Sequence, residues 1–179
     1  GGGIFNTRAI TLTNVTLYNN RSEPCSSCTG SFDVNAPAEN GAVGGNQLAV
    51  FGRDSGSSPG VTMTNTIIAN GIDSNPGTTA CSGVTTPINY KTLIRSSGGN
   101  LENSNSCGLI PTGTSRTPDI INSSNLGLDA TLAIDSRFPD TTPVHALLPN
   151  SDAIDHANIS ICPQVDQRFL QRTDGRCDI

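Results

Sequence analysis

The chain has 179 residues, a formal net charge of −5 and only 14% charged residues. Hydrophobic residues make up 34% of the chain and Trp is absent, while Ser, Thr, Asn and Gly are abundant. This composition excludes a coiled coil or helical bundle, and the acidic balance argues against a surface that neutralises nucleic-acid phosphates. No run of about 18 apolar residues predicts a membrane span. The sequence opens at Gly1 without a signal segment, so we expect a processed chain or a fragment.

A repeat is visible near the N-terminus. Residues 10–20 align with residues 61–71, and the two copies share Thr, Asn and apolar positions. Apolar side chains alternate with a period of two, which predicts strands and not helices. In each copy the alternation changes phase at a single asparagine, Asn14 or Asn65. Because Asn tolerates the left-handed backbone conformation, we predict that each of these residues turns the chain through a corner.

Strands separated by single-residue corners predict a chain that winds around an axis. Each strand then pairs in parallel with its equivalent one coil later, and apolar side chains stack inside. A glycine-rich strand over residues 44–52, similar to residues 2–6, belongs to the same unit. We expect outward loops over the polar stretches 21–43, 53–59 and 71–90. The prediction is one domain, with coils over residues 1–109 and an irregular cap over residues 110–179 that covers the last coil.

Six cysteines are an even number in a chain with a single Lys, which favours disulfides over scattered thiols. Six cysteines allow 15 pairings, and their placement favours three local ones. These are Cys25 with Cys28, Cys81 with Cys107, and Cys162 with Cys177. A redox or zinc role for the first pair is the alternative, although no second Cys-x-x-Cys motif accompanies it.

Two sets of stretches resemble known families. Residues 1–6 and 10–14 resemble the repeats of polymorphic outer-membrane-protein-like right-handed parallel β-helices. Later stretches are similar to the closing region of bacterial choice-of-anchor Q domain proteins: 97–101, 107–109, 142–149, 153–155, 162–168 and 177–179. The resemblance implies an all-β, right-handed, single-stranded parallel β-helix (a solenoid) that is secreted or displayed at the cell surface. It implies no reaction, and the chain departs from the family where Phe169 and Leu170 replace glycine.

Parallel β-helices often carry polysaccharide lyases or hydrolases, and a glycoside hydrolase needs two carboxylates facing one sugar. The predicted coil strands contain no acidic residue. The acids available to such an enzyme lie on predicted loops and are Asp33, Asp54 and Asp73. His145 and His156 have no nucleophile motif beside them, so we expect His145 to be packed or hydrogen-bonded within the cap.

The acidic residues of the predicted cap have two interpretations. One is a structural Ca²⁺ ion, although the spacing of the acids matches no Ca²⁺-binding loop. The candidate ligands are Asp152, Asp155, Asp166 and Asp174. The favoured interpretation is ion pairing, of Asp166 with Arg168 and of Asp178 with Arg172 or Arg176. We expect no other cofactor.

We therefore predict a non-catalytic β-helix module for adhesion, surface display or extracellular assembly. Contact with carbohydrate or a cell-surface protein would use polar loops and the aromatic residues Tyr18, Phe32 and Tyr90. The alternative is a polysaccharide lyase or hydrolase whose carboxylates lie on loops. The edge of the first coil, at residues 1–6, is a further candidate for pairing with a second copy of the chain.

Overall fold

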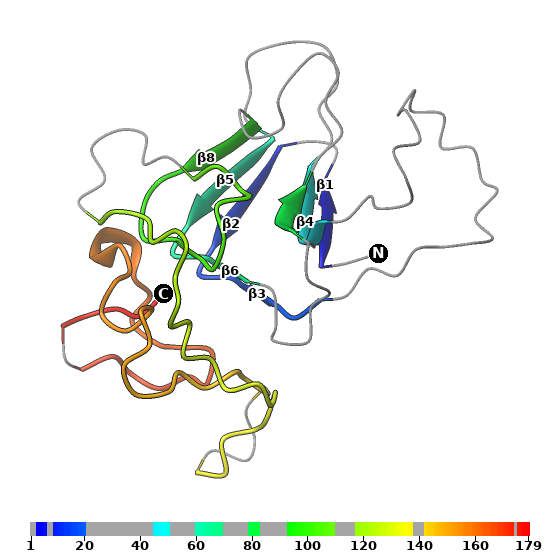
Figure 1. Ribbon diagram of the computed structural model, residues 1–179. Coiled ribbons are helices and arrows are strands. Elements are labelled where there is room, and N and C mark those ends of the chain that lie inside the picture. Colours follow the sequence, from blue (N-terminus) through cyan, green and yellow to red (C-terminus); the bar gives the residue numbers. More distant parts are fainter. Residues whose placement is uncertain are drawn as a thin grey trace, which may run out of the picture.

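The computed structural model shows an all-β protein with parallel sheets (Figure 1). It describes residues 3–6, 9–20, 45–50, 60–69, 79–82, 93–109, 117–137, 142–173 and 175–179. The strands are β1 (Ile4–Asn6), β2 (Ile10–Thr13), β3 (Thr16–Tyr18), β4 (Gly45–Val50), β5 (Val61–Thr64), β6 (Ile67–Ala69), β7 (Thr79–Ser82), β8 (Ile94–Ser96) and β9 (Leu101–Glu102).

The strands form three sheets of three parallel strands each. Their orders are β1-β4-β7, β2-β5-β8 and β3-β6-β9, so the chain passes through the three sheets in the same order three times. The register pairs Ile10 with Val61 and Leu12 with Met63. This pairing confirms that the two copies of the repeat are neighbouring parallel strands. In Figure 1, β1 and β4 face the sheet that contains β2, β5 and β8, and β3 and β6 run below these strands, between the two sheets.

An asparagine opens each two-residue connection between the strands of the repeat, where the change of phase predicts a corner. Asn14 lies between β2 and β3 with φ 55°, and Asn65 lies between β5 and β6 with φ 48°. In this left-handed region the chain changes direction within one residue and enters the next sheet. After the corner, side chains again alternate between the inward and the outward face of the next sheet.

The third passage through the sheets differs from the sequence prediction. The stretch 71–90 was expected to be an outward loop, but β7 lies within it, and Ala80 and Cys81 are fully buried. This expectation is wrong for the residues of β7 because two small apolar residues in a four-residue strand give too short a pattern to recognise. Strands β8 and β9 complete this passage and were not predicted either.

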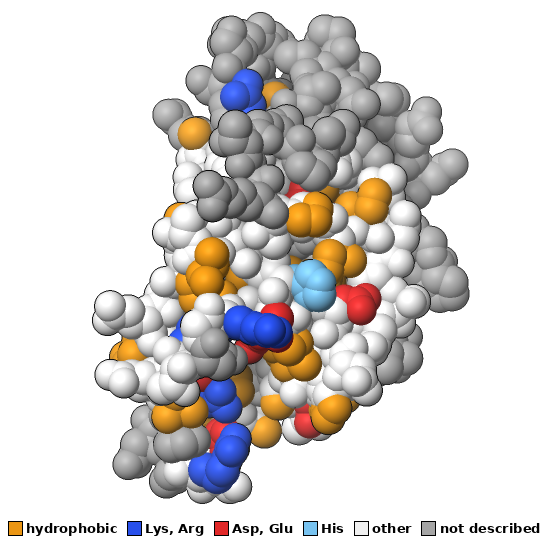
Figure 2. Space-filling model, turned by 90° about the vertical axis from the view of Figure 1, so that its left-hand side faces the viewer, with side chains coloured by type: hydrophobic (Ala, Val, Ile, Leu, Met, Phe, Trp, Pro, Cys, Tyr) orange, Lys and Arg blue, Asp and Glu red, His pale blue; other side chains and the backbone are white. Residues whose placement is uncertain are grey.

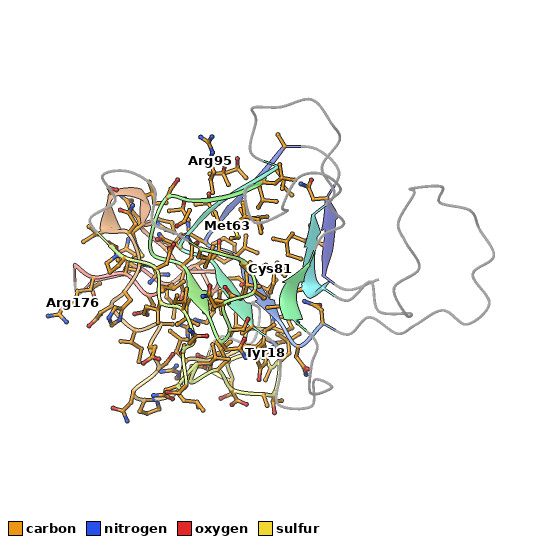
Figure 3. The ribbon with its side chains drawn as sticks, turned by 45° about the horizontal axis from the view of Figure 1, so that its top comes forward. Tyr18, Met63, Cys81, Arg95 and Arg176 are labelled. Carbon is orange, nitrogen blue, oxygen red and sulfur yellow. A yellow bond between two sulfur atoms is a disulfide. The ribbon has the colours of Figure 1, made fainter. Side chains whose placement is uncertain are left out.

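Two hydrophobic clusters hold the sheets and the C-terminal residues together. The first draws side chains from all three sheets, including Leu48, Met63 and Ile68, and is therefore enclosed by them. Figure 3 shows Met63 and Cys81 between the sheets. The second cluster joins Ile67 and Leu101 to C-terminal residues such as Leu128. Neighbouring Ile67 and Ile68 point to opposite faces of the sheet, so a single strand contributes to both clusters.

Residues 117–179, here called the C-terminal segment, contain no long strand in the part that the structure describes. Isolated bridges order them, pairing Leu101 with Ile120, Leu128 with Leu147, Ala133 with Val144, and Val165 with Gln171. A short 3-10 helix, η2 (Ile159–Ile161), adds one turn.

Two of the three predicted disulfides are present in the described residues. Cys81 in β7 is bonded to Cys107, which follows β9, and Cys162 is bonded to Cys177 in the C-terminal segment. The remaining pair, Cys25 and Cys28, lies outside the described residues. Disulfides of this kind are typical of an extracellular or otherwise oxidising environment.

Candidate interaction surface

The C-terminal segment is attached to the sheets at the asparagine corners. The Asn65 side chain donates to Asn14 Oδ1 at 3.1 Å and to the carbonyl of Asn158 at 3.2 Å. Its Oδ1 accepts the backbone N–H of Asn158 at 2.6 Å. A row of three asparagines therefore runs from the first corner, through the second, to the C-terminal segment.

Glycine at position 99 makes this attachment possible. Gly99 has φ +69°, and a Cβ atom built there would lie 2.7 Å from the backbone nitrogen of Asn158 and 2.5 Å from Asn65 Oδ1. No side chain fits between the corner and the C-terminal segment at this point. The close approach places Asn158 within hydrogen-bond distance of Asn65.

A second contact joins β3 to the C-terminal segment. The ring of Tyr18 meets the ring of His145 edge to face, with centroids 4.9 Å apart and an interplanar angle of 78°. His145 Nδ1 donates to the Asp129 carbonyl at 2.8 Å, because a carbonyl oxygen can only accept. His145 is thus half-buried and hydrogen-bonded, as predicted. Tyr18, a predicted binding residue, lies in β3 and packs against it.

Every acidic side chain in the described ranges has a hydrogen-bonding partner within this chain. These residues are Glu102, Asp119, Asp129, Asp135, Asp152, Asp155, Asp166 and Asp178. Glu102 is fully buried at the end of β9, where Oε1 accepts hydrogen bonds from Ser104, Ser106 and Cys107. These carboxylates hold the chain's own loops and turns in place.

Both predicted ion pairs are present, the second with Arg172 as the partner of Asp178. Asp166 pairs with Arg168 at 2.5 Å, and Asp178 lies 3.9 Å from Arg172. Arg176 instead pairs with Asp155, at 2.7 Å. Figure 3 shows the Arg176 side chain pointing away from the body of the molecule.

The candidate Ca²⁺ ligands do not converge in the described part of the chain. Asp152 accepts from Ser123, whereas Asp155 and Asp166 are bound by different arginines. Asp174 lies outside the described residues. Among the residues that the structure describes, no group of three or more His, Cys, Asp or Glu side chains is placed to hold a metal ion.

Asp166 organises a tight turn in the C-terminal segment. Its Oδ1 accepts the backbone N–H groups of Arg168 at 2.8 Å and of Leu170 at 3.1 Å. Its own N–H donates to the Leu170 carbonyl, and the N–H of Phe169 donates to the Asp166 carbonyl. Burial raises the pKa of Asp166, but the hydrogen bonds from Arg168 and Leu170 outweigh it and hold this pKa below its usual value.

Arg168 ties this turn to a second segment. Its Nε and Nη2 donate to Asp166, and its Nη1 donates to Asp135 at 3.0 Å. Asp135 also accepts from Arg137, and hydrogen bonds from Arg137, followed by the one from Arg168, hold the pKa of Asp135 well below its usual value. The turn is therefore fixed to residues 131–137 by charged hydrogen bonds.

Apolar side chains are exposed on these two joined segments. Phe169 is 78% exposed, and its backbone is in the left-handed region, with φ 62°. Leu132 is 59% exposed, and Ile134 and Val165 are also exposed. We call these four residues the Phe169 surface. Figure 2 shows a face of the molecule on which hydrophobic side chains lie among basic and acidic ones.

Most binding and catalytic candidates from the sequence lie where the structure describes nothing. Asp33, Asp54, Asp73, Phe32 and Tyr90 are all outside the described residues. The exposed Phe169 was not among the predicted binding residues. The only signal for it in the sequence was a bulky residue directly after a charged Asp-Gln-Arg turn, where glycine is easier to accommodate.

Comparisons with protein-family models, curated proteins and solved structures find no match to this chain. The described residues contain no helix with the length and apolar character that crossing a membrane requires.

Proposed function

We propose that the chain is a non-catalytic, secreted or surface-displayed module that attaches to a protein partner through the Phe169 surface. We further propose that its strands form a right-handed, single-stranded parallel β-helix whose last coil is capped by the C-terminal segment. The repeated passage through three parallel sheets and the two disulfides support this proposal.

The observation that carries the proposed binding role is the way Phe169 is displayed. A bulky residue with positive φ persists only where its surroundings impose it, at a cost of about 1–3 kcal/mol. Here the Asp166 hydrogen bonds impose the turn, and Arg168 anchors it to Asp135. A large apolar side chain held outward at this cost is more consistent with selection for binding than with selection for stability.

Preorganisation makes such a side chain an effective anchor. Burying a Phe side chain against a partner contributes about 1.5–3 kcal/mol. Little of this is lost to ordering, because the backbone around Phe169 is already fixed. Leu132 and Ile134 are also exposed and lie on the segment that Arg168 joins to the Phe169 turn. Arg137, whose side chain is 72% exposed, lies on the same segment. An apolar centre with a polar rim is the usual composition of a protein interface.

The carboxylates support a non-catalytic role for the described part of the chain. A sugar-cleaving pair needs two carboxyl groups that face one substrate bond, separated by about 5 to 9.5 Å. The described carboxylates are instead bound to arginines, hydroxyls and backbone N–H groups of this chain.

Adhesion of protein-coated beads tests the proposal directly. The beads are applied to surfaces coated with fibronectin, collagen or mucin, and the force or shear that detaches them is measured. The test variant is Phe169→Gly, which removes the ring and relieves the positive φ, so it should not destabilise the fold. The control is Ile159→Ser, since Ile159 is similarly exposed, at 63%, but lies on η2.

The expected result is adhesion to at least one coating that falls at least about tenfold for Phe169→Gly and is unchanged for Ile159→Ser. Equal adhesion of all three proteins would refute the role of the Phe169 surface. Cleavage of pectate, alginate or hyaluronan by the unmodified protein, lost on changing Asp54 or Asp73 to Asn, would refute the non-catalytic proposal and favour a lyase or hydrolase.

A further inference from the structure

The two disulfides that the structure describes differ in how easily a reagent reaches them. Cys81 and Cys107 are fully buried, and both belong to the first hydrophobic cluster. Cys162 is only half-buried, although its partner Cys177 is 3% exposed. A thiolate can therefore attack the second bond from the Cys162 side in the folded protein. The first bond becomes accessible only when the sheets open.

The chain enclosed by the accessible bond, residues 163–176, has no buried core. We call it the disulfide loop. None of its described residues is buried. The bridge between Val165 and Gln171 and the Asp166 turn join the loop only to itself. Opening the loop therefore exposes little apolar surface, which places it among the least stable parts of the fold.

Polar contacts at the surface join the disulfide loop to the rest of the molecule. Arg168 donates to Asp135, as described above. The side chain of Gln167 donates to Thr142 Oγ1 at 3.3 Å and to the Pro143 carbonyl at 3.5 Å. Each contact of this kind contributes little, because water competes for the same groups. If the disulfide opens, these contacts must also offset the entropy that the freed chain gains.

The two ends of the accessible bond are attached to the body of the molecule in different ways. The carbonyl of Cys177 accepts the N–H of Ala157 at 2.9 Å, and the N–H of Ile179 donates to the Ala153 carbonyl at 2.9 Å. These bonds keep Cys177 in place when the disulfide is broken. Cys162 follows the exposed helix η2, so it can move away with the loop and return to the same partner.

We propose that the Cys162–Cys177 disulfide is a reversible redox switch that controls the Phe169 surface. The proposal rests on the proposed function for its consequence, because Phe169 lies within the disulfide loop. In the oxidised protein the loop is closed and displays Phe169 in a fixed position. In the reduced protein the loop opens, the anchor loses its preorganisation, and binding weakens while the sheets stay folded.

The reductant that operates the switch is a dithiol. One of its thiolates attacks the sulfur of Cys162, the bond between the two cysteines breaks, and Cys177 leaves as a thiolate that takes up a proton. The second thiol of the reductant then displaces Cys162 from the mixed disulfide. Two electrons and two protons pass to the protein, which ends with two thiols, and the reductant ends as a disulfide.

Graded reduction with dithiothreitol tests which bond opens first. The released thiols are alkylated at successive times and located by peptide mass spectrometry. The expected result is that Cys162 and Cys177 are alkylated at least about tenfold faster than Cys81 and Cys107. Circular dichroism of the same samples should show that the strands persist after the first bond has opened.

Trypsin cleavage reports the opening of the loop without any measurement of binding. Arg168 and Arg172 are cleavage sites inside the disulfide loop. Cleavage at these sites should speed up at least about tenfold on reduction and slow again after reoxidation with oxidised glutathione. The control is the double variant Cys162→Ser and Cys177→Ser, in which cleavage should be fast from the start and unaffected by dithiothreitol.

Adhesion of the same protein-coated beads completes the test. We expect it to fall at least about tenfold when the first bond is reduced and to return on reoxidation. Equal reduction rates of the two bonds, a loop that resists trypsin after reduction, or adhesion that reduction leaves unchanged would each overturn the switch. If no coating binds the oxidised protein, the proposed function fails, and the reduction rates and trypsin cleavage still decide whether this bond controls the position of Phe169.

Discussion

Asn65 performs two tasks that few residues can combine. Its backbone turns the corner with φ 48°, and its fully buried side chain binds both Asn14 and Asn158. Glycine would permit the turn but would leave the neighbouring polar groups without partners. Alanine would lose the hydrogen bonds and also strain the backbone. The corner and the attachment of the C-terminal segment therefore depend on one side chain.

Substitutions at Asn65 should separate these two contributions. We expect Asn65→Gly to lower the free energy of unfolding by about 2–3 kcal/mol, through loss of buried hydrogen bonds. Asn65→Ala should cost about 1 kcal/mol more, because of the positive φ. Asn14→Gly is the control, since Asn14 is exposed and accepts only one of these bonds. Urea unfolding measures all three, and equal losses for Asn65→Gly and Asn14→Gly would contradict this account.

At the scale of elements, the strands are too short to be stable alone and depend on their neighbours in the stack. The strands of the repeat were predictable because β2, β3, β5 and β6 keep alternating apolar residues around an asparagine. The third passage was not predictable, since Ser96 and Glu102 occupy inward positions that are apolar in earlier passages. Loop hydrogen bonds to Glu102 compensate for that change, and no periodic pattern reveals them.

The Asp166 turn is an element whose stability should depend on pH. The pKa of Asp166 is lowered in the folded protein. The stabilisation that ionised Asp166 provides is therefore fully present above the pKa of this residue in the unfolded chain, about 3.9. It is lost as the pH falls through the lower pKa that Asp166 has in the folded protein. Asp166→Asn should lower the melting temperature at pH 7 by a few degrees. The difference in melting temperature between the unmodified protein and Asp166→Asn should shrink as the pH is lowered below about 4.

Thermal unfolding of both proteins at several pH values provides the measurement. Asp129→Asn is a suitable control, because Asp129 accepts only the nearby Thr131 N–H through its side chain and forms no ion pair in the described structure. A difference between the unmodified protein and Asp166→Asn that stayed constant down to pH 2 would contradict the electrostatic role of Asp166.

At the scale of the whole molecule, the C-terminal segment brings the sheets and the Phe169 surface together. The disulfide between Cys162 and Cys177 could be predicted, because the chain has an even number of cysteines and these two are close to each other in the sequence. The exposure of Phe169 could not be predicted. It depends on an irregular segment without periodicity, whose conformation is fixed by specific bonds such as Arg168 to Asp135.

Removing the Cys162–Cys177 disulfide should affect the C-terminal segment and leave the sheets in place. The bond spans 15 residues, and closing a loop of this size stabilises a protein by about 3 kcal/mol. It encloses the Asp166 turn, and Cys177 also accepts the N–H of Ala157, next to the Asn158 attachment.

We expect the double variant Cys162→Ser and Cys177→Ser to lose Phe169-dependent adhesion, to become sensitive to proteolysis within residues 157–177, and to retain the circular dichroism of the strands. The double variant Cys81→Ser and Cys107→Ser is the comparison, because that bond lies within the sheets and its loss should weaken the strand signal first. If the first variant lost its strand signal as readily as the second, the C-terminal segment would be required for the sheets to fold and would not be an attachment to an already stable stack.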